Sequence, residues 1–229
     1  ISMADLEYAK DRIMMGAERK SAVITEESRR LTAYHESGHA IVASFTEGSL
    51  PVHKATIVPR GMALGLVLQL PDVDETSFSR RQMEAKMDVC MAGRVAEELI
   101  FGEDEVTTGA SNDLERVAST AKMMVTRFGM SERVGQVALA QDGGSPFMGR
   151  QMGTQQRQVS GETKALVDQE VSRLVNQAYA KAKLLLQDNR PALDALAKLL
   201  VEKETVTADE FQQILNDTGV KIGSYGIYA

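Results

Sequence analysis

The stretch His35-Glu36-Ser37-Gly38-His39 decides how this chain is interpreted, because it places the pattern H-E-x-x-H inside a segment of helical periodicity. Residues four positions apart on a helix lie one above the other, so both imidazoles face the same side. Together they can bind one Zn²⁺, with the carboxylate of Glu36 directed at the open coordination position of the metal. The motif is typical of zinc peptidases, and it predicts a helix that carries a metal site.

The helix around this motif has recognisable boundaries in the sequence. Thr25 is a capping residue, and two acidic residues follow it at the positive end of the helix dipole. The helix is expected to continue to about Thr46, with Gly48 as its stop. Leu31 and Val42 share one stripe with the motif. The site is therefore expected beside the core rather than in open water.

Composition limits the class of protein. The 229 residues are 43% hydrophobic, which is enough for one large buried core. A net charge of −6 and the lack of a Lys/Arg-rich block argue against nucleic acid as a partner. The single cysteine, Cys90, excludes an intramolecular disulfide, and its apolar helical surroundings predict a small buried residue. No apolar run of about 18 residues is present, so this part of the protein is expected to be soluble.

Outside the motif, the pattern predicts a mainly α protein with a small β-hairpin insert. Strands are expected at 53–58 and 63–70, joined by a Pro/Gly turn at 59–62. The second strand, ALGLVLQL, is apolar almost throughout, so it is either buried or an edge that accepts another strand. Further helices are expected at 2–17, 79–100, 112–129, 160–188, 191–202 and 207–217.

A peptidase zinc needs a third protein ligand besides the two histidines. The metzincin continuation H-x-x-G-x-x-H is absent, and the remaining histidine, His53, lies at the start of a strand. Two acidic sites compete for the role. Glu97-Glu98 mimics the downstream glutamate of thermolysin-like zincins, whereas Asp113 lies in the first turn of a helix. Spacing alone does not decide, because the helix dipole is a sufficient reason for an acid at that position.

Five segments together resemble the FtsH family of membrane-anchored AAA+ zinc proteases. They are HESGHAIVA, KATIVPRG, GRVAEELIFG, TTGASNDLERVASTAKMMVTRFGMS and the opening AKDRIMMGAERKS. The resemblance covers nearly the whole chain in the family's order. Within the family, YHESGHAIVA and MDVCMAGRVAEELIFG are most similar to the mitochondrial i-AAA branch and its plant organelle relatives.

The resemblance implies roles for individual residues. Asp113, the aspartate of the SND motif, would be the third metal ligand beside His35 and His39. Glu36 would be the catalytic base, and Glu97 would orient a ligand histidine from behind. The family's edge strand, which pairs with extended substrate, corresponds to Ala63, Leu64, Gly65, Leu66, Val67 and Leu68.

The resemblance also implies a domain organisation. Residues 1–20 match the end of the family's ATPase module, in its lid region, and 21–217 would form a helical, zincin-type peptidase domain. Residues 141–158 are expected to be a mobile loop, and 218–229 a loose tail. A transmembrane part and the ATPase module are expected to precede this sequence. The chain has no G-x-x-x-x-G-K-[ST] phosphate loop, so ATP would bind only to that module.

These expectations describe the proteolytic domain of an ATP-dependent, membrane-tethered zinc endopeptidase with one Zn²⁺ per chain. Unfolded, misassembled or membrane proteins would be its substrates, delivered by the ATPase module of a hexamer. The full-length protein is expected at a mitochondrial inner membrane or a chloroplast membrane rather than a bacterial inner membrane. The alternative is a zinc-stabilised helical assembly module without peptidase activity. Glu36 separates the two, because a structural zinc has four protein ligands and no use for an unligated carboxylate.

Overall fold

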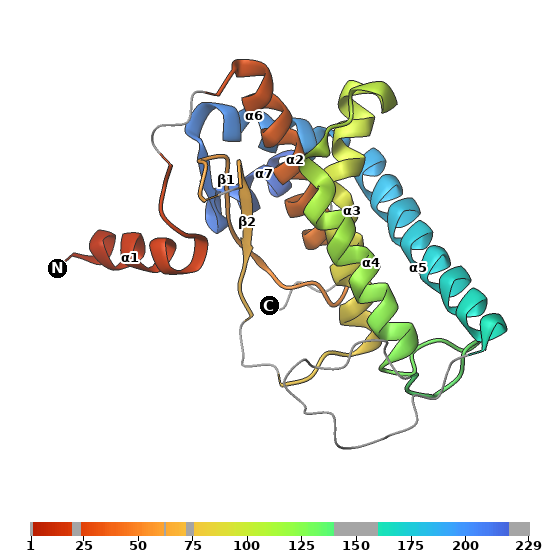
Figure 1. The fold of residues 1–229 in the computed structure, drawn as a ribbon. Coiled ribbons are helices and arrows are strands. Elements are labelled where there is room, and N and C mark those ends of the chain that lie inside the picture. The colour runs from red at the N-terminus through yellow and green to blue at the C-terminus, as the bar shows by residue number, and fades with distance from the viewer. Residues whose placement is uncertain (1, 20–23, 62, 72–75, 140–159, 220–229) are drawn as a thin grey trace.

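The fold is mainly helical, with one small sheet (Figure 1). The computed structural model describes residues 2–19, 24–61, 63–71, 76–139 and 160–219. The predicted loop at 141–158 and all but the first two residues of the predicted tail at 218–229 lie outside the described residues. The elements are α1 Met3–Met15, α2 Glu26–Phe45, β1 Val52–Thr56, β2 Leu66–Gln69, α3 Arg80–Phe101, the 3-10 turns η1 Glu103–Glu105 and η2 Thr108–Ala110, α4 Ser111–Thr126, α5 Gly161–Asp188, α6 Arg190–Lys203, β3 Thr205–Thr207 and α7 Ala208–Asp217.

Local capping chemistry explains where four of the helices start. The Thr25 hydroxyl accepts from the amide of Ser28 at the start of α2, and Ser160 caps α5 in the same way. Ser79 at α3 and Thr207 at α7 each form a complete capping box with a residue three positions later. These starts confirm the boundaries expected from the sequence.

The start of α4 differs from the expectation. A helix was expected to begin at residue 112, but it already begins at Ser111, and its N-cap residue, Ala110, has no side-chain hydrogen bond to the first turn. The reason is the 3-10 turn η2, which leads directly into α4; the Ser111 hydroxyl donates to the carbonyl of Thr108 across it, at 2.6 Å. This continuous path sets the direction in which the first turn of α4 points.

The sheet contains three antiparallel strands in the order β2-β1-β3. Its β1–β2 pair confirms the predicted hairpin, but the second strand begins at Leu66 rather than Ala63. Ala63 instead exchanges two backbone hydrogen bonds with Arg60, at 2.9 and 3.0 Å, which turns the chain before the strand starts. The third strand, β3, was not predicted, because three residues between two helices are too few for a strand period to be recognised. Among the described strands, β2 lies at one edge of the sheet.

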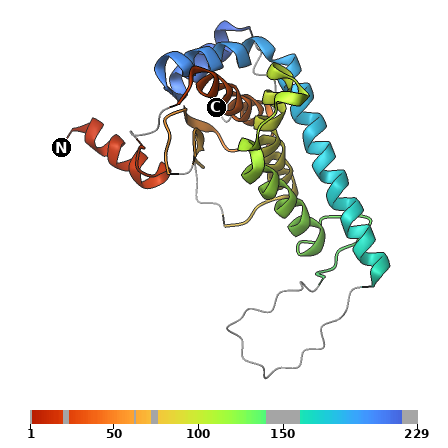
Figure 2. The ribbon, with the colours of Figure 1, turned by 45° about the horizontal axis from the view of Figure 1, so that its top comes forward.

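The core forms where α2 crosses α3, and α4, α5 and α6 pack around this pair (Figures 1 and 2). The crossing is close because of Gly38: a Cβ there would lie 2.6 Å from the carbonyl oxygen of Ala92 and 2.8 Å from the Cβ of Ala96. Cys90 of α3 is buried in this core, as the sequence predicted, together with three methionines of the same helix, Met83, Met87 and Met91.

Helix α1 stands beside the sheet, away from the main helices, in both views (Figures 1 and 2). Polar contacts attach it there: Lys54 of β1 pairs with Asp11 at 2.7 Å, and the Lys10 ammonium lies 3.1 Å from the His53 ring. Within the described residues, no helix combines the length and the apolar character needed to cross a membrane.

Candidate metal centre

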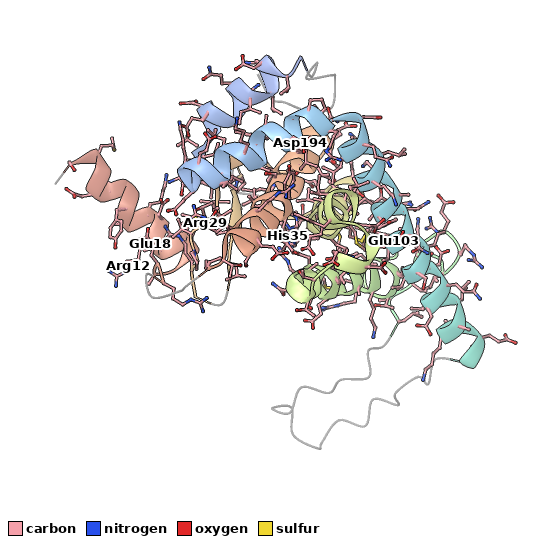
Figure 3. All side chains as sticks on the ribbon, turned by 90° about the horizontal axis from the view of Figure 1, so that it is seen from above. Arg12, Glu18, Arg29, His35, Glu103 and Asp194 are labelled. Atoms are coloured by element: carbon pink, nitrogen blue, oxygen red, sulfur yellow. The ribbon has the colours of Figure 1, made fainter. Side chains whose placement is uncertain are left out.

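Three side chains from two helices meet at one point. His35 and His39 stand one turn apart on α2, and Asp113 comes from the first turn of α4. The two Nε2 atoms are 3.1 Å apart, and each lies 3.3 Å from Oδ2 of Asp113. Their side chains are 11, 11 and 16% exposed, so the group is sheltered but reachable. Figure 3 labels His35 at the centre of the molecule, beside the neighbouring helices.

Hydrogen bonds behind the two rings fix their orientation. Nδ1 of His39 lies 2.7 Å from the carbonyl oxygen of Val89, which can only accept, so this nitrogen carries the proton. Nδ1 of His35 donates in the same way to Oε1 of Glu97, at 2.7 Å. Both Nε2 atoms therefore direct lone pairs toward the carboxylate of Asp113, and three acceptors face one another across a gap.

Such a group attracts a positive charge. Burial disfavours a charged imidazole at His35, but the hydrogen bonds to Asp113 and Glu97 outweigh it and raise the pKa of His35 above its ordinary value. Burial likewise disfavours the carboxylate of Asp113, but the two histidines lower its pKa. A proton shared within the group is one way to satisfy these preferences, and a metal cation is the other.

The donor atoms fit a zinc ion. Two imidazole nitrogens and one carboxylate oxygen are a common ligand set for zinc, which prefers tetrahedral coordination. With bonds of about 2.0–2.1 Å, a tetrahedral ion keeps its ligand atoms about 3.3 Å apart. The observed separations of 3.1–3.3 Å agree with that triangle. Among the described residues, this is the set of His, Cys, Asp and Glu side chains close enough to hold a metal ion together.

Glu36 lies between the two histidines in sequence and is buried, only 6% exposed. Burial raises its pKa, against the opposing influence of the two histidines. The segment that enters β2 covers it closely: a Cβ on Gly65 would lie 2.6 Å from its Oε1 atom. A buried carboxylate beside these ligand atoms can accept a proton and return it during a reaction.

Glu97 links His35 of α2 to the turn that leads to Asp113 of α4. While Oε1 accepts from His35, Oε2 accepts from the backbone amide and the hydroxyl of Thr107, at 2.8 and 3.0 Å. Thr107 is the N-cap of η2, the turn that leads into α4 and to Asp113. The sequence interpretation missed Thr107 and the Val89 carbonyl, although the first lies in the TTGASND segment.

The other candidates from the sequence lie elsewhere. Glu98 bonds to Tyr179 and Lys183 of α5, and His53 contacts Lys10, so neither joins the metal group. The predicted substrate strand is only partly a strand, since Leu66, Val67 and Leu68 belong to β2 whereas 63–65 precede it.

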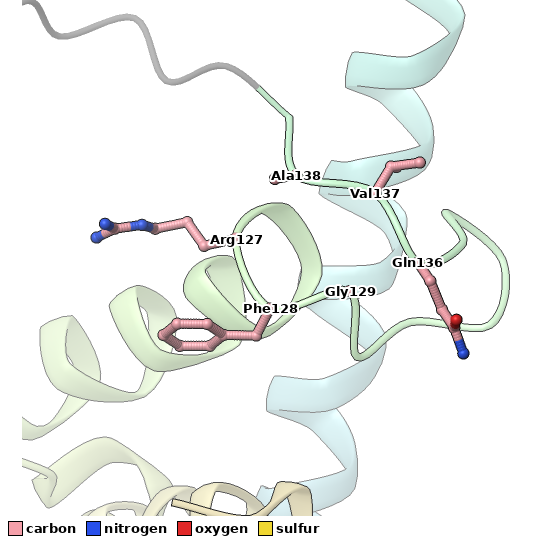
Figure 4. Close-up of a pocket in the computed structure, with 6 residues that line it drawn as sticks. All are labelled: Arg127, Phe128, Gly129, Gln136, Val137 and Ala138. Atoms are coloured by element: carbon pink, nitrogen blue, oxygen red, sulfur yellow. The ribbon is translucent and has the colours of Figure 1, made fainter. Parts of the chain in front are cut away.

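A separate pocket follows the end of α4 (Figure 4). It is lined by Arg127, Phe128, Gly129, Gln136, Val137 and Ala138. None of these residues belongs to the metal group or to the predicted substrate strand. This pocket therefore contributes nothing to the site.

Comparison with known proteins agrees with the geometry. The family model described as peptidase family M41 matches residues 22–214. The ATP-dependent zinc metalloprotease FtsH 3 of Synechocystis sp. is 49% identical over 225 residues, covering 97% of this chain and 36% of that protein. The ATP-dependent zinc metalloprotease FTSH 11, chloroplastic/mitochondrial, of Arabidopsis thaliana is 50% identical over 215 residues, covering 94% of this chain and 25% of its own length.

A relative from a fungus is similar to this chain as well. The ATP-dependent zinc metalloprotease YME1 homolog of Schizosaccharomyces pombe is 45% identical over 215 residues, covering 94% of this chain and 28% of that protein. The chain thus spans between a quarter and somewhat over a third of the length of these three relatives. The family match, which covers most of the chain, and these identities confirm the resemblance, and the chain belongs to peptidase family M41 as the peptidase domain of an FtsH-type metalloprotease.

Proposed function

We propose that this domain is a zinc endopeptidase, with His35, His39 and Asp113 as the metal ligands and Glu36 as the catalytic base. The single observation that carries the proposal is the convergence of three ligand atoms beside a buried carboxylate that is not one of them. A structural zinc would be closed by four protein ligands, whereas the described part of the chain offers three. This favours peptidase chemistry over the zinc-stabilised assembly module.

The side chains divide the work of hydrolysis. When bound, zinc supplies Lewis acidity, which polarises the peptide carbonyl and acidifies water. Glu36 accepts the proton of the attacking water at its carboxylate and passes it to the nitrogen of the leaving amine. Its burial keeps its pKa above the ordinary value, which favours the proton that it accepts. Glu97 and the Val89 carbonyl hold the two imidazoles in place during these transfers.

The substrate is proposed to be an extended polypeptide that pairs with β2. This strand bonds to β1 along one side and lies at the edge of the sheet. Gly65, directly before it, packs against Glu36, so a segment paired with the strand would pass close to the base. Residues Leu66, Val67 and Leu68 of the strand are therefore the part of the predicted substrate strand that we retain.

The wider activity is proposed for the full-length protein. The curated relatives are ATP-dependent by name, and an ATPase module that unfolds substrates, a membrane anchor and a hexameric ring would complete the machine. Residues 1–20 are proposed to belong to the end of that module and 21–217 to the peptidase domain. A folded substrate must be opened before it can lie along β2, and the cost approaches its global stability of about 5–15 kcal/mol.

We also propose a location: the full-length protein resides at an organelle membrane. Two relatives, from Arabidopsis thaliana and Oryza sativa subsp. japonica, are chloroplastic/mitochondrial by name, with 50 and 48% identity. Bacterial relatives match at 45–49%, so the bacterial inner membrane is the competing location. Imaging of a tagged full-length protein in its own cells distinguishes the two.

The test of the peptidase proposal is Glu36→Gln. This change removes the proton acceptor but keeps the size of the side chain, so cleavage of an unstructured peptide should fall about 10²–10⁴-fold. Zinc content, measured by atomic absorption, should stay at about one ion per chain. Glu103→Gln is the control, because it makes the same change at an exposed position of η1 and should leave both measurements unchanged.

Two outcomes would contradict the proposal. Turnover of Glu36→Gln above roughly a tenth of wild type would indicate another base, since loss of a general base costs more than that. A wild-type domain that binds zinc but cleaves no peptide, even an unstructured one, would favour the assembly module instead.

A further inference from the structure

The side of α3 that faces the histidines carries three positions spaced by four residues. At the first, the Val89 carbonyl accepts from Nδ1 of His39; at the third, the Glu97 carboxylate accepts from Nδ1 of His35. The position between them is Gly93. Residues at this spacing lie along one stripe of a helix, so α3 offers two anchors with a gap between them.

The gap at Gly93 holds the two imidazoles and leaves no room for a side chain. A Cβ on Gly93 would lie 2.5 Å from Cε1 and 2.5 Å from Nε2 of His35, and 2.6 Å from Nε2 of His39. Real Cβ atoms essentially never approach another heavy atom within 3.0 Å. Even the smallest side chain would therefore collide with the two nitrogens that form the metal group.

The rings cannot easily retreat from such a collision. Each is held at Nδ1 by an acceptor on α3 itself, so the two anchors draw the imidazoles onto the same surface that a side chain would occupy. Gly93 is not among the glycines with positive φ, so backbone conformation gives no reason for a glycine here. A glycine inside a helix costs about 1 kcal/mol relative to alanine. The need for space beside the two histidines therefore explains why a glycine occupies this position despite its cost.

We propose that Gly93 is a positioning residue for the metal site: its missing side chain lets both Nε2 atoms approach α3 and meet Asp113 in one triangle. The inference rests on the proposed function for the identity of the ion, which we take to be Zn²⁺. The steric part, between Gly93 and the two imidazoles, does not depend on any ion.

The first test measures metal binding by Gly93→Ala. We expect zinc affinity to fall by at least about 10-fold, the lower end of the cost of losing a residue that orients a metal ligand. The visible absorption of the Co²⁺-loaded protein should also change, because it reports coordination geometry. Gly161→Ala is the matched control: it makes the same change at the first position of α5, where a Cβ would meet nothing within 4 Å. It should keep the affinity and the spectrum of the wild type.

The second test uses metal-free protein, so that a damaged fold and a damaged site can be separated. Gly93→Ala should lower the melting temperature in the wild-type background. It should lower it clearly less in a background that carries His35→Ala and His39→Ala, because the colliding rings are then gone. An equal loss in both backgrounds would show that Gly93 serves only helix packing, and would overturn the proposal.

The outcomes also separate this proposal from the proposed function. A Gly93→Ala protein with wild-type zinc affinity and an unchanged Co²⁺ spectrum would overturn the role of Gly93 while the peptidase proposal stands. A wild-type protein that binds no zinc would defeat the peptidase proposal, and the metal-free comparison would still decide the steric role of Gly93.

Discussion

Two buried glutamates in this domain have opposite surroundings. Glu170 of α5 is 1% exposed, and the chain itself neutralises it: it accepts from Arg173 and Arg133, at 3.0–3.2 Å, and from the Ser131 hydroxyl, at 2.8 Å. Glu97 of α3 is 0% exposed, but its partners are a histidine, a backbone amide and a hydroxyl. No arginine or lysine is among the hydrogen-bond partners described for it.

The difference separates a structural cluster from a site. Around Glu170 the protein itself supplies the positive charge that the carboxylate needs, so no cation from outside is required. Around Glu97 and Asp113 the protein gathers carboxylates and imidazole lone pairs and leaves a positive charge to be supplied. An unbalanced buried cluster is costly unless a ligand completes it, which makes it the better indicator of function.

The largest effect is expected at Asp113, in the cluster that lacks a positive charge. Asp113→Asn replaces a carboxylate ligand by a weak amide, so zinc affinity should fall by more than the roughly 10–100-fold that loss of an outer partner costs. Competition with a chelator of known affinity measures it. If Asp113→Asn kept its zinc while Glu97→Gln lost it, the assignment of these two acids would be reversed.

A change at Glu170 should alter the stability of the fold rather than zinc binding. Glu170→Gln removes the charge that two arginines share, and these arginine side chains are 53 and 37% exposed, so water recovers part of the loss. We expect a loss of about 2 kcal/mol in the free energy of unfolding, the usual value for hydrogen bonds to charged groups. Urea unfolding measures this loss, with Asp168→Asn, exposed on the same helix, as the control. A change in zinc affinity would show that the two clusters are coupled.

A smaller effect is expected where Thr107 supports the metal group. Thr107→Val keeps the backbone amide that donates to Glu97 but removes the hydroxyl donor, so zinc affinity should fall about 10-fold. Thr107→Ser keeps the hydroxyl and should restore most of the affinity. The same replacement at the next residue, Thr108→Val, should have no effect on zinc. Equal losses in Thr107→Val and Thr107→Ser would point to packing rather than to the hydrogen bond.

The last prediction is the dependence of stability on pH. Arg173 lowers the pKa of Glu170 to about 2, against its ordinary value of 4.5, with Ser131 and Arg133 contributing. A lowered pKa stabilises the fold fully above about pH 4.5, and the contribution is lost as pH falls toward about 2. The stability difference between wild type and Glu170→Gln should therefore shrink across that window in metal-free protein. A constant difference would mean that the pKa of Glu170 is the same in the native and the unfolded states, so that the arginines do not lower it.

Local signals in the sequence were enough for much of the helical fold. Thr25, Ser79 and Thr207 were identified as helix starts because a cap and its partner lie within one turn of each other. The start expected at residue 112 was wrong because the 3-10 turn before it is continuous with the helix, and no local residue pattern marks that turn. The strand β3 is too short for any period to be visible.

The site was predicted in part, for a similar reason. His35, Glu36 and His39 lie within one turn of one helix, so their spacing alone suggested the chemistry. The choice between Glu97 and Asp113 could not be made from spacing, because it depends on how α4 meets α2. Gly93 was missed altogether, since a glycine has no chemistry to attract notice, and its role is visible only beside the two rings.

The pairing of β1 with β3 has a consequence for the order in which the domain can mature. The hydroxyls of Thr56 and Thr205 meet at 2.8 Å although they are 149 positions apart in the chain. Closing so long a loop costs entropy before the contacts repay it, which is the mark of high contact order and slow folding. During synthesis the last of the three proposed ligands emerges at residue 113, whereas α6, which packs against α2, ends at residue 203 and β3 at residue 207. A nascent chain therefore carries all three proposed ligands long before it has the scaffold that arranges them, and translation itself delays the appearance of the native peptidase.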